Sequence, residues 1–223
     1  MDSSLRITAV DPDPRRPDAV RVEIDGARFG AVPRELATAE GLAVGRVVDP
    51  ALQELLASAA DAEAAYRTVL RALEVRSYAR HDLGRRMLRK GHQQQAVEAA
   101  LERAARFGLL DDAAFAQSYV RTRSARGRGP ARLVRDLLSM GVDRALIDRA
   151  IAAEWSEETD KTEMPLALAK KRAAQLGGLP RQTKRRRLVA YLARRGFTGR
   201  DITEIVDTVV RAGSLERGVA PNS

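Results

Sequence analysis

Hydrophobic residues recur along this chain in three copies of one pattern, each centred on a glycine, namely Gly91, Gly141 and Gly196. The glycines are 50 and 55 residues apart (141 minus 91 and 196 minus 141), which is the size of one supersecondary unit. Apolar residues stand eight, four and three positions before each glycine and six and ten positions after it. In that order they are Leu83, Leu133 and Leu188; Met87, Leu137 and Leu192; Leu88, Leu138 and Ala193; Val97, Ile147 and Ile202; Leu101, Ile151 and Val206.

These offsets predict a helix, a glycine break and a second helix in each copy. Positions −8, −4 and −3 share one stripe of an α-helix, as do +6 and +10 on the next, whereas a strand would need a period of two. Glycine suits the break because helices often end on a left-handed residue. On the side of the first helix away from the stripe, arginines occupy −6 (Arg85 and Arg135) and −2 (Arg89 and Arg194).

Alternating patterns before the repeats predict a small β module. Asp25-Gly26 is a strong signal for a two-residue hairpin turn, since glycine accepts the positive φ that the turn requires. Residues 11–18 are rich in Pro, Asp and Arg and are expected to form an exposed loop, and Pro33 is expected to open a short helix over 34–41. The expected strands are 5–10, 19–24 and 27–32, with 44–48 as a further candidate.

Each glycine-centred pair has a third helix before it. A helical region is expected from Asp49 to about Val75, with Asp61 as the N-cap of the helix that leads into the first pair. Asp111 or Asp112 is expected to begin the helix before the second pair, and Pro165 the helix before the third. Residues 177–180 (GGLP) should separate that helix from the next.

We therefore predict a mainly α fold, with tandem three-helix repeats in an elongated array preceded by a small, mostly β N-terminal module. The expected parts are a β-rich module (1–50), a first repeat with its lead-in helix (51–108), a second repeat (109–153), an acidic linker (154–164), a third repeat (165–212) and a flexible tail (213–223).

Composition adds a charge asymmetry to this picture. The net charge is +9, but residues 1–60 carry 7 basic and 10 acidic residues, so the remaining 163 residues carry +12. Such a field favours polyanions, nucleic acid first. The competing interpretation is that the arginines reflect biased codon usage and are mostly solvated.

Cysteine is absent, and no signal-like or membrane-spanning stretch is visible, so a cytoplasmic protein is expected.

The residues that could carry catalysis have simpler explanations. Asp111 and Asp112 would point about 100° apart on a helix and are better explained as capping residues. His81 and His92 lack the spacing of a metal site. The segment 127–130 (GRGP) lacks the strand and the Gly-Lys-Ser/Thr ending of a phosphate loop, and is interpreted as a basic turn. We expect no enzyme, no metal and no cofactor.

Three basic clusters remain as candidate binding residues, because guanidinium groups pair with phosphate and carboxylate oxygens and recur here at related offsets. Aromatic residues, 4% of the chain, are too few for a base-stacking surface. The clusters are Arg85, Arg86, Arg89 and Lys90; Arg121, Arg123, Arg126, Arg128, Arg132 and Arg135; and Arg181, Lys184, Arg185, Arg186, Arg187, Arg194 and Arg195.

The region 66–153 resembles the RecX family of bacterial regulatory proteins. The resemblance lies in Val69–Arg76, in Asp82–Gly91 (DLGRRMLRKG), in Gly108–Arg123 (GLLDDAAFAQSYVRTR) and in Arg126–Val142. The third repeat fits by its period. The small β module is similar to that of longer family members.

This resemblance implies a non-enzymatic modulator of the RecA recombinase. Family members lodge in the groove of the RecA filament on single-stranded DNA, inhibit strand exchange, ATPase and coprotease activity, and thereby limit the SOS response and modulate DNA repair. The implied partners are the RecA filament and single-stranded DNA of any sequence, with no membrane, and the chain would act as a monomer. The alternative from another class is a stand-alone helix-turn-helix-like DNA-binding protein or transcription regulator.

Overall fold

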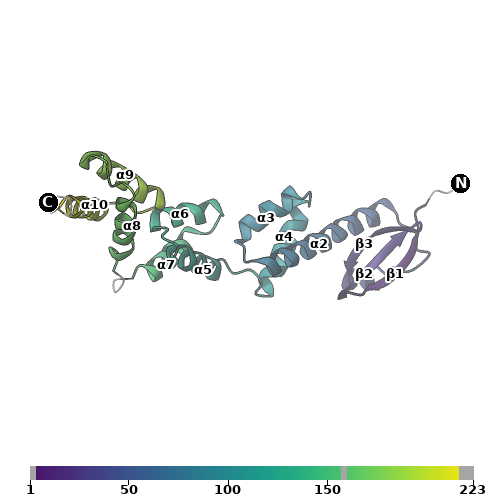
Figure 1. Ribbon diagram of the computed structural model, residues 1–223. Coiled ribbons are helices and arrows are strands. Elements are labelled where there is room, and N and C mark those ends of the chain that lie inside the picture. The colour runs from purple at the N-terminus through teal and green to yellow at the C-terminus, as the bar shows by residue number, and fades with distance from the viewer. Residues whose placement is uncertain (1–3, 157–159, 216–223) are drawn as a thin grey trace. The chain divides into compact units, whose positions relative to one another are not determined.

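The computed structural model describes residues 4–156 and 160–215, which divide into two compact units between Asp111 and Asp112. As predicted, the described chain is mainly α, with a small sheet at its N-terminal end (Figure 1). Its elements are β1 (Ile7–Asp13), β2 (Arg16–Ile24), β3 (Ala27–Pro33), α1 (Arg34–Ala39), α2 (Pro50–Val75), α3 (Arg80–Arg89), α4 (Gln94–Arg106), α5 (Asp112–Ser124), α6 (Pro130–Ser139), α7 (Arg144–Glu154), α8 (Glu163–Ala174), α9 (Arg181–Arg195) and α10 (Arg200–Leu215).

The three strands form an antiparallel sheet in the order β1-β2-β3. The predicted hairpin turn is confirmed: Asp25 (φ 49°) and Gly26 (φ 76°) are both left-handed, as a two-residue turn of this kind requires. The loop expected over 11–18 is wrong, because β1 continues to Asp13 and β2 begins at Arg16. Pro12 is tolerated there because β1 is an edge strand and its pairing shifts register at this point.

Two further expectations for the N-terminal region are corrected. The candidate strand 44–48 is reduced to one isolated bridge between Arg6 and Val47. Residues 50–75 form one uninterrupted helix, α2, whose N-cap is Asp49; its carboxylate accepts the N–H of Leu52 at 2.8 Å. Asp61 is therefore not an N-cap of α2. It lies within the helix and accepts the backbone N–H of Gln93 at 2.9 Å, at the start of α4.

The repeated pattern forms the cores of the helical pairs. Gly91, Gly141 and Gly196 are all left-handed, with φ of 91°, 78° and 95°. In each copy the third helix packs on the first, α4 on α2, α7 on α5 and α10 on α8. The residues at −8, −4 and +6 are buried in all three copies. Position −3 is a correction: Leu88 and Leu138 are 45% and 44% exposed, so they lie outside the packed stripe.

A buried carboxylate joins the sheet to the first repeat. Glu63 of α2 is 2% exposed and pairs with Arg103 of α4, at 2.7 Å between Nη1 and Oε1, and with Arg16 of β2. Both arginines also pair with Asp18 of β2 and flank the ring of Tyr66, with Cζ atoms 4.2 and 5.2 Å from its centroid. The network therefore cross-links β2, α2 and α4.

The predicted linker and tail are only partly covered by the described residues. α7 ends at Glu154 and α8 begins at Glu163, and part of the predicted linker, 157–159, lies outside the described residues. α10 continues to Leu215, past the predicted start of the tail at 213, and residues 216–223 lie outside the described part. Within the described chain, no helix combines the length and apolar character needed to cross a membrane.

Candidate functional site

The helix that precedes each repeat glycine carries most of the candidate binding residues, whereas Arg121 and Arg123 lie on α5 and Arg126 and Arg128 lie between α5 and α6. Arg85 and Arg89 on α3, Arg135 on α6 and Arg194 on α9 are exposed, on the side away from the buried leucines, as predicted. Leu88 and Leu138 are exposed beside these arginines, since positions −6, −3 and −2 are neighbours on one helix face. Each of the first two repeats therefore presents an apolar side chain with arginine beside it.

In the first cluster, Arg85 pairs with Asp82 at 3.1 Å, and Arg89 and Lys90 are exposed in and just after the last turn of α3. Cations are favoured at this end of a helix because its carbonyl groups carry partial negative charge. Arg86 approaches the ring of Tyr78, with 5.9 Å between Cζ and the centroid. These contacts leave Arg89 and Lys90 as the most available cations at the C-terminal end of α3.

In the second cluster, two arginines are held by one carboxylate. Arg128 and Arg132 pair with Asp136 at 2.6 and 2.9 Å, and Tyr119 donates its hydroxyl to the same carboxylate at 3.4 Å. Burial, followed by the charge of Asp136, raises the pKa of Tyr119 above its usual value. Arg123 lies over the Tyr119 ring, at 5.4 Å. Arg128 and Arg132 thus stabilise α6, whereas Arg121, Arg126 and Arg135 are exposed to solvent.

The third cluster divides in the same way. Arg185 pairs with Asp207 of α10 at 2.6 Å, and its hydrogen bond is the largest cause that holds the pKa of Asp207 below its usual value. Arg195 donates to the carbonyl oxygen of Gly127 at 3.2 Å. Arg185 is itself exposed, and the other exposed members are Arg181, Arg186, Arg187 and Arg194.

Lys184 does not belong to an exposed surface, because it is only 5% exposed. It lies four residues before Leu188, on the same side of α9, and twelve before Gly196. The corresponding residues of the other repeats, Ala79 and Gly129, are also buried. Had the pattern been extended to position −12, the sequence would have indicated this burial.

The segment interpreted as a basic turn joins the second repeat to the third. Gly129 donates its N–H to the carbonyl oxygen of Arg195 at 2.7 Å, and Ala131 donates to that of Gly196 at 3.2 Å. A Cβ on Gly196 would lie 2.4 Å from the backbone nitrogen of Arg132. Gly129 and Gly196 therefore allow two backbones to approach closely, a role that the sequence pattern did not indicate.

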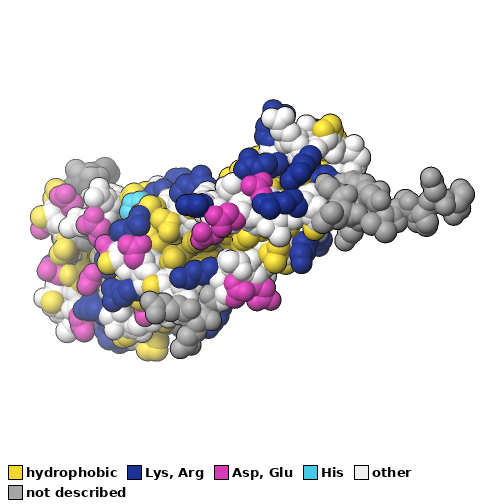
Figure 2. All heavy atoms as spheres, turned by 90° about the vertical axis from the view of Figure 1, so that its left-hand side faces the viewer, with side chains coloured by type: hydrophobic (Ala, Val, Ile, Leu, Met, Phe, Trp, Pro, Cys, Tyr) yellow, Lys and Arg dark blue, Asp and Glu magenta, His cyan; other side chains and the backbone are white. Residues whose placement is uncertain are grey.

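Acidic side chains lie among the basic ones on the face of the molecule that Figure 2 shows. Figure 2 views the side of the molecule on which α8, α9 and α10 lie in Figure 1, and shows Lys and Arg side chains interspersed with Asp and Glu rather than in one unbroken patch. Within residues 4–156 and 160–215, no group of three or more His, Asp or Glu side chains is placed to hold a metal ion.

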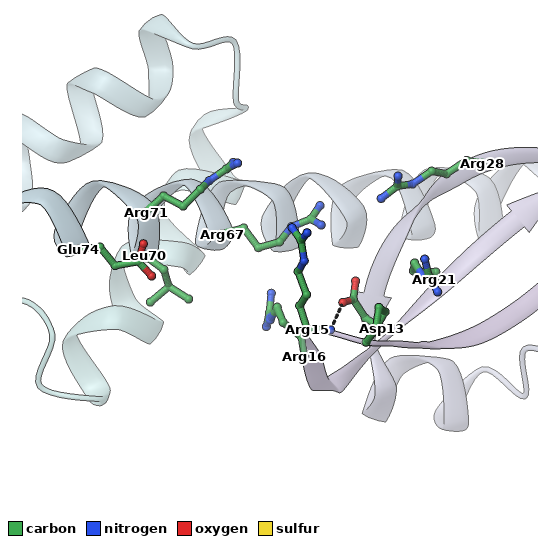
Figure 3. A pocket seen from close by; sticks show the side chains of 10 residues that line it. Asp13, Arg15, Arg16, Arg21, Arg28, Arg67, Leu70, Arg71 and Glu74 are labelled. Atoms are coloured by element: carbon green, nitrogen blue, oxygen red, sulfur yellow. Dashed lines mark hydrogen bonds between the residues drawn. The ribbon is translucent and has the colours of Figure 1, made fainter.

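A further set of arginines lies outside the three clusters. Residues of the sheet and of α2 line a pocket of about 600 Å³ in the N-terminal unit, and six of its ten lining residues are arginines (Figure 3). The sequence alone indicated no chemistry in the β module, because the net charge of residues 1–60 is negative.

Two models of known protein domains match the second and third repeats. The family model described as RecX, second three-helix domain, matches residues 111–151, and the one described as RecX, third three-helix domain, matches residues 160–206. A solved structure, the crystal structure of regulatory protein RecX, covers 92% of this chain and 99% of its own, with a TM-score of 0.71 and 22% identity. The crystal structure of RecX from Lactobacillus salivarius covers 70% of this chain and 97% of its own, with a TM-score of 0.56 and 22% identity. These structures support the fold.

Curated relatives carry the family assignment. Regulatory protein RecX of Pelodictyon phaeoclathratiforme is 30% identical over 155 residues, which cover 69% of this chain and 94% of the relative. The protein of the same name from Halorhodospira halophila is 34% identical over 62% of this chain and 84% of the relative. That from Streptomyces coelicolor is 37% identical over 61% of this chain and 72% of the relative. This chain therefore belongs to the RecX family of regulatory proteins.

Proposed function

We propose that this chain binds the RecA filament on single-stranded DNA and restrains its recombinase, ATPase and coprotease activities, acting as a monomer and without catalysis of its own. Membership of the RecX family supports regulation of RecA in general. Filament binding is the step that we add to this general role. In this proposal the chain acts in the bacterial cytoplasm, where it modulates DNA repair and the SOS response.

The observation that carries the proposal is the repeated exposed face of the helix before each glycine. Leu88 and Leu138 occupy the same offset in two repeats, and arginines at −6 or −2 adjoin them. A leucine contributes little to binding a phosphate backbone, but it can be buried against protein, with arginines contacting acidic side chains or phosphates beside it. Repeated mixed faces of this kind suit a partner that itself repeats, such as a filament of identical protomers on DNA.

The fixed spacing of the second and third repeats supports the same partner. The backbone contact of Gly129 and Ala131 with Arg195 and Gly196 holds these two repeats together within one compact unit. Two rigidly spaced faces lose less entropy on binding than two independently moving ones, provided that their spacing matches the partner.

The arginines divide into structural and binding groups in this proposal. Arg128, Arg132, Arg185 and Arg195 hold carboxylates or carbonyl groups of the chain itself. The exposed arginines of the three clusters that have no ion-pair partner in the described structure are the proposed contacts. They are Arg86, Arg89, Arg121, Arg126, Arg135, Arg181, Arg186, Arg187 and Arg194.

The proposal is tested by titrating the protein into a RecA ATPase assay on single-stranded DNA, with binding to the naked DNA measured in parallel. We expect inhibition at protein concentrations that leave naked DNA largely unbound. Inhibition that appears only when the naked DNA is saturated would contradict filament binding and favour a stand-alone DNA-binding protein, which acts by competing for the strand.

A further inference from the structure

The pocket of the N-terminal unit collects basic side chains from several elements. Its lining residues come from the end of β1, the β1–β2 turn, β2, β3 and α2; they are Asp13, Pro14, Arg15, Arg16, Arg21, Arg28, Arg67, Leu70, Arg71 and Glu74. Four of the seven basic residues within 1–60 are among them. The acidic module thus concentrates its positive charge at one place, where α2 adds two more arginines (Figure 3).

Most of this charge is not neutralised inside the protein. Arg16 pairs with Glu63 and Asp18, and Arg71 contacts the Thr68 hydroxyl at 3.4 Å. By contrast, Arg15, Arg21, Arg28 and Arg67 form no ion pair with any carboxylate of the described chain. Six guanidinium groups share this pocket with only two carboxylates, Asp13 and Glu74, so they raise each other's electrostatic energy, and a bound anion would relieve this repulsion.

One polar atom of the pocket lacks a partner inside the protein, and one carboxylate orders the turn beside the pocket. The Nε atom of Arg21 is buried and has no hydrogen-bond partner in the described structure, which is costly for a charged donor. The Asp13 carboxylate accepts the backbone N–H of Arg15 at 2.9 Å, and thus orders the turn that carries the Arg15 side chain. In Figure 3, this turn brings Arg15 to the same pocket as Arg67 of α2.

We propose that this pocket binds backbone phosphate groups of single-stranded DNA. Guanidinium groups pair with phosphate oxygens through two parallel hydrogen bonds, and the volume of about 600 Å³ admits more than one such group. No aromatic side chain lines the pocket, so bases have no stacking partner and binding is independent of sequence. An acidic protein segment suits the pocket less well, because the only apolar residues in its lining are Pro14 and Leu70.

The site is separate from the repeat faces of the proposed function and does not depend on them. In this proposal the β module binds the DNA strand while the repeats contact the filament. The two ideas can fail independently, because the first concerns binding to naked DNA through the N-terminal unit and the second concerns the preference for filament over naked DNA.

The test measures binding of the full chain to a fluorescent oligothymidylate of about thirty nucleotides, as a function of salt. Arg28→Ala and Arg67→Ala remove arginines that form no ion pair, so the fold is kept, which far-ultraviolet circular dichroism verifies. We expect each to lower affinity about threefold to tenfold and to reduce the salt slope by about 0.7 for each phosphate group that is no longer neutralised. Arg28→Lys, which keeps the charge but not the planar fork, should fall between.

Arg46→Ala is the matched control. It removes one positive charge from the same unit outside the pocket, where Arg46 pairs loosely with Glu40 at 3.6 Å. If the pocket variants bind oligothymidylate no more weakly than Arg46→Ala, the phosphate site is refuted. If they keep oligothymidylate binding but lose inhibition of the RecA filament, the pocket binds an acidic protein surface and our assignment is also overturned.

Discussion

Gly129 donates its backbone N–H to the carbonyl oxygen of Arg195 across 2.7 Å, and this hydrogen bond joins the second three-helix repeat to the third. A Cβ on Gly129 would lie 2.6 Å from the carbonyl carbon of Gly196, closer than real Cβ atoms come to such an atom. The obstacle is backbone on both sides, so no rotation of a side chain could relieve it. The contact therefore requires glycine at position 129.

Gly129→Ala should push the two repeats apart and destabilise the C-terminal unit by about 1–3 kcal/mol, the usual cost of overpacking. Urea denaturation measures the change. Gly178→Ala is the control, because a Cβ there meets nothing within 4 Å. Equal unfolding midpoints for the two variants would show that the close approach is not needed for stability.

Glu63→Gln should destabilise the N-terminal unit strongly. The substitution leaves Arg16 and Arg103 beside a neutral amide in a buried site, and breaking a buried ion pair costs about 3–5 kcal/mol. The comparison is Glu102→Gln, which removes the exposed pair with Arg80 and should change the free energy of unfolding by less than about 1 kcal/mol. Chemical denaturation of both variants should separate them clearly; similar losses would mean that the network contributes no more than a surface pair.

Acid should weaken the same network through Asp18. Burial raises the pKa of this carboxyl, but the charges of Arg16 and Arg103 outweigh burial and hold the pKa below its ordinary value of 3.8. A lowered pKa in the folded state stabilises the protein above the unfolded-state value, and this contribution is lost as the pH falls through the folded-state value. Urea midpoints measured from about pH 6 to about pH 2 should therefore fall less steeply for Asp18→Asn. Parallel curves for the two proteins would contradict this linkage.

Leu88→Gln should separate binding from folding. Its side chain is 45% exposed, so the variant should keep the unfolding midpoint while weakening inhibition of RecA. Leu83→Ala, five residues earlier on the buried side of the same helix, should instead cost about 2–5 kcal/mol of stability. If Leu88→Gln inhibits the RecA ATPase as well as the unmodified protein, the apolar position of the repeated face plays no part in binding.

Charge reversals on α6 should give two different results. Arg135→Glu should weaken inhibition without loss of stability, because Arg135 is exposed and forms no ion pair within the described chain. Arg132→Glu should also destabilise the helix, since it places a second carboxylate beside Asp136, which Arg132 contacts at 2.9 Å. Thermal unfolding and ATPase inhibition, measured on both variants, distinguish the two roles. If Arg135→Glu inhibits the RecA ATPase as well as the unmodified protein, α6 does not contact the filament.

The sequence predicted the parts of this fold that depend on local periodicity. The repeated offsets located the left-handed glycines and the buried leucines, the Asp25-Gly26 pair located the hairpin, and the GLLDD segment indicated the family. Each of these signals depends on residues close together in the chain. Local steric and hydrophobic preferences are enough to decide such features.

Features decided by tertiary contacts were not predictable in this way. Asp61 looked like an N-cap, but α2 continues through it, and its carboxylate accepts the N–H of Gln93, just before α4, instead. Lys184 is different, because position −12 of the repeat pattern, where Ala79 and Gly129 are also buried, indicates its burial. The arginine pocket gathers residues from separate strands and a helix, and their spacing in the sequence follows no single period.

The most direct test of the central claim compares the affinity of the full chain for one oligothymidylate in two forms, naked and coated with RecA in the presence of a slowly hydrolysed ATP analogue. Fluorescence anisotropy at several salt concentrations gives both constants. The filament-binding account predicts binding to the coated strand at least about tenfold tighter, a difference of about 1.4 kcal/mol, with a smaller salt dependence. Equal affinities, or tighter binding to the naked strand, would contradict it.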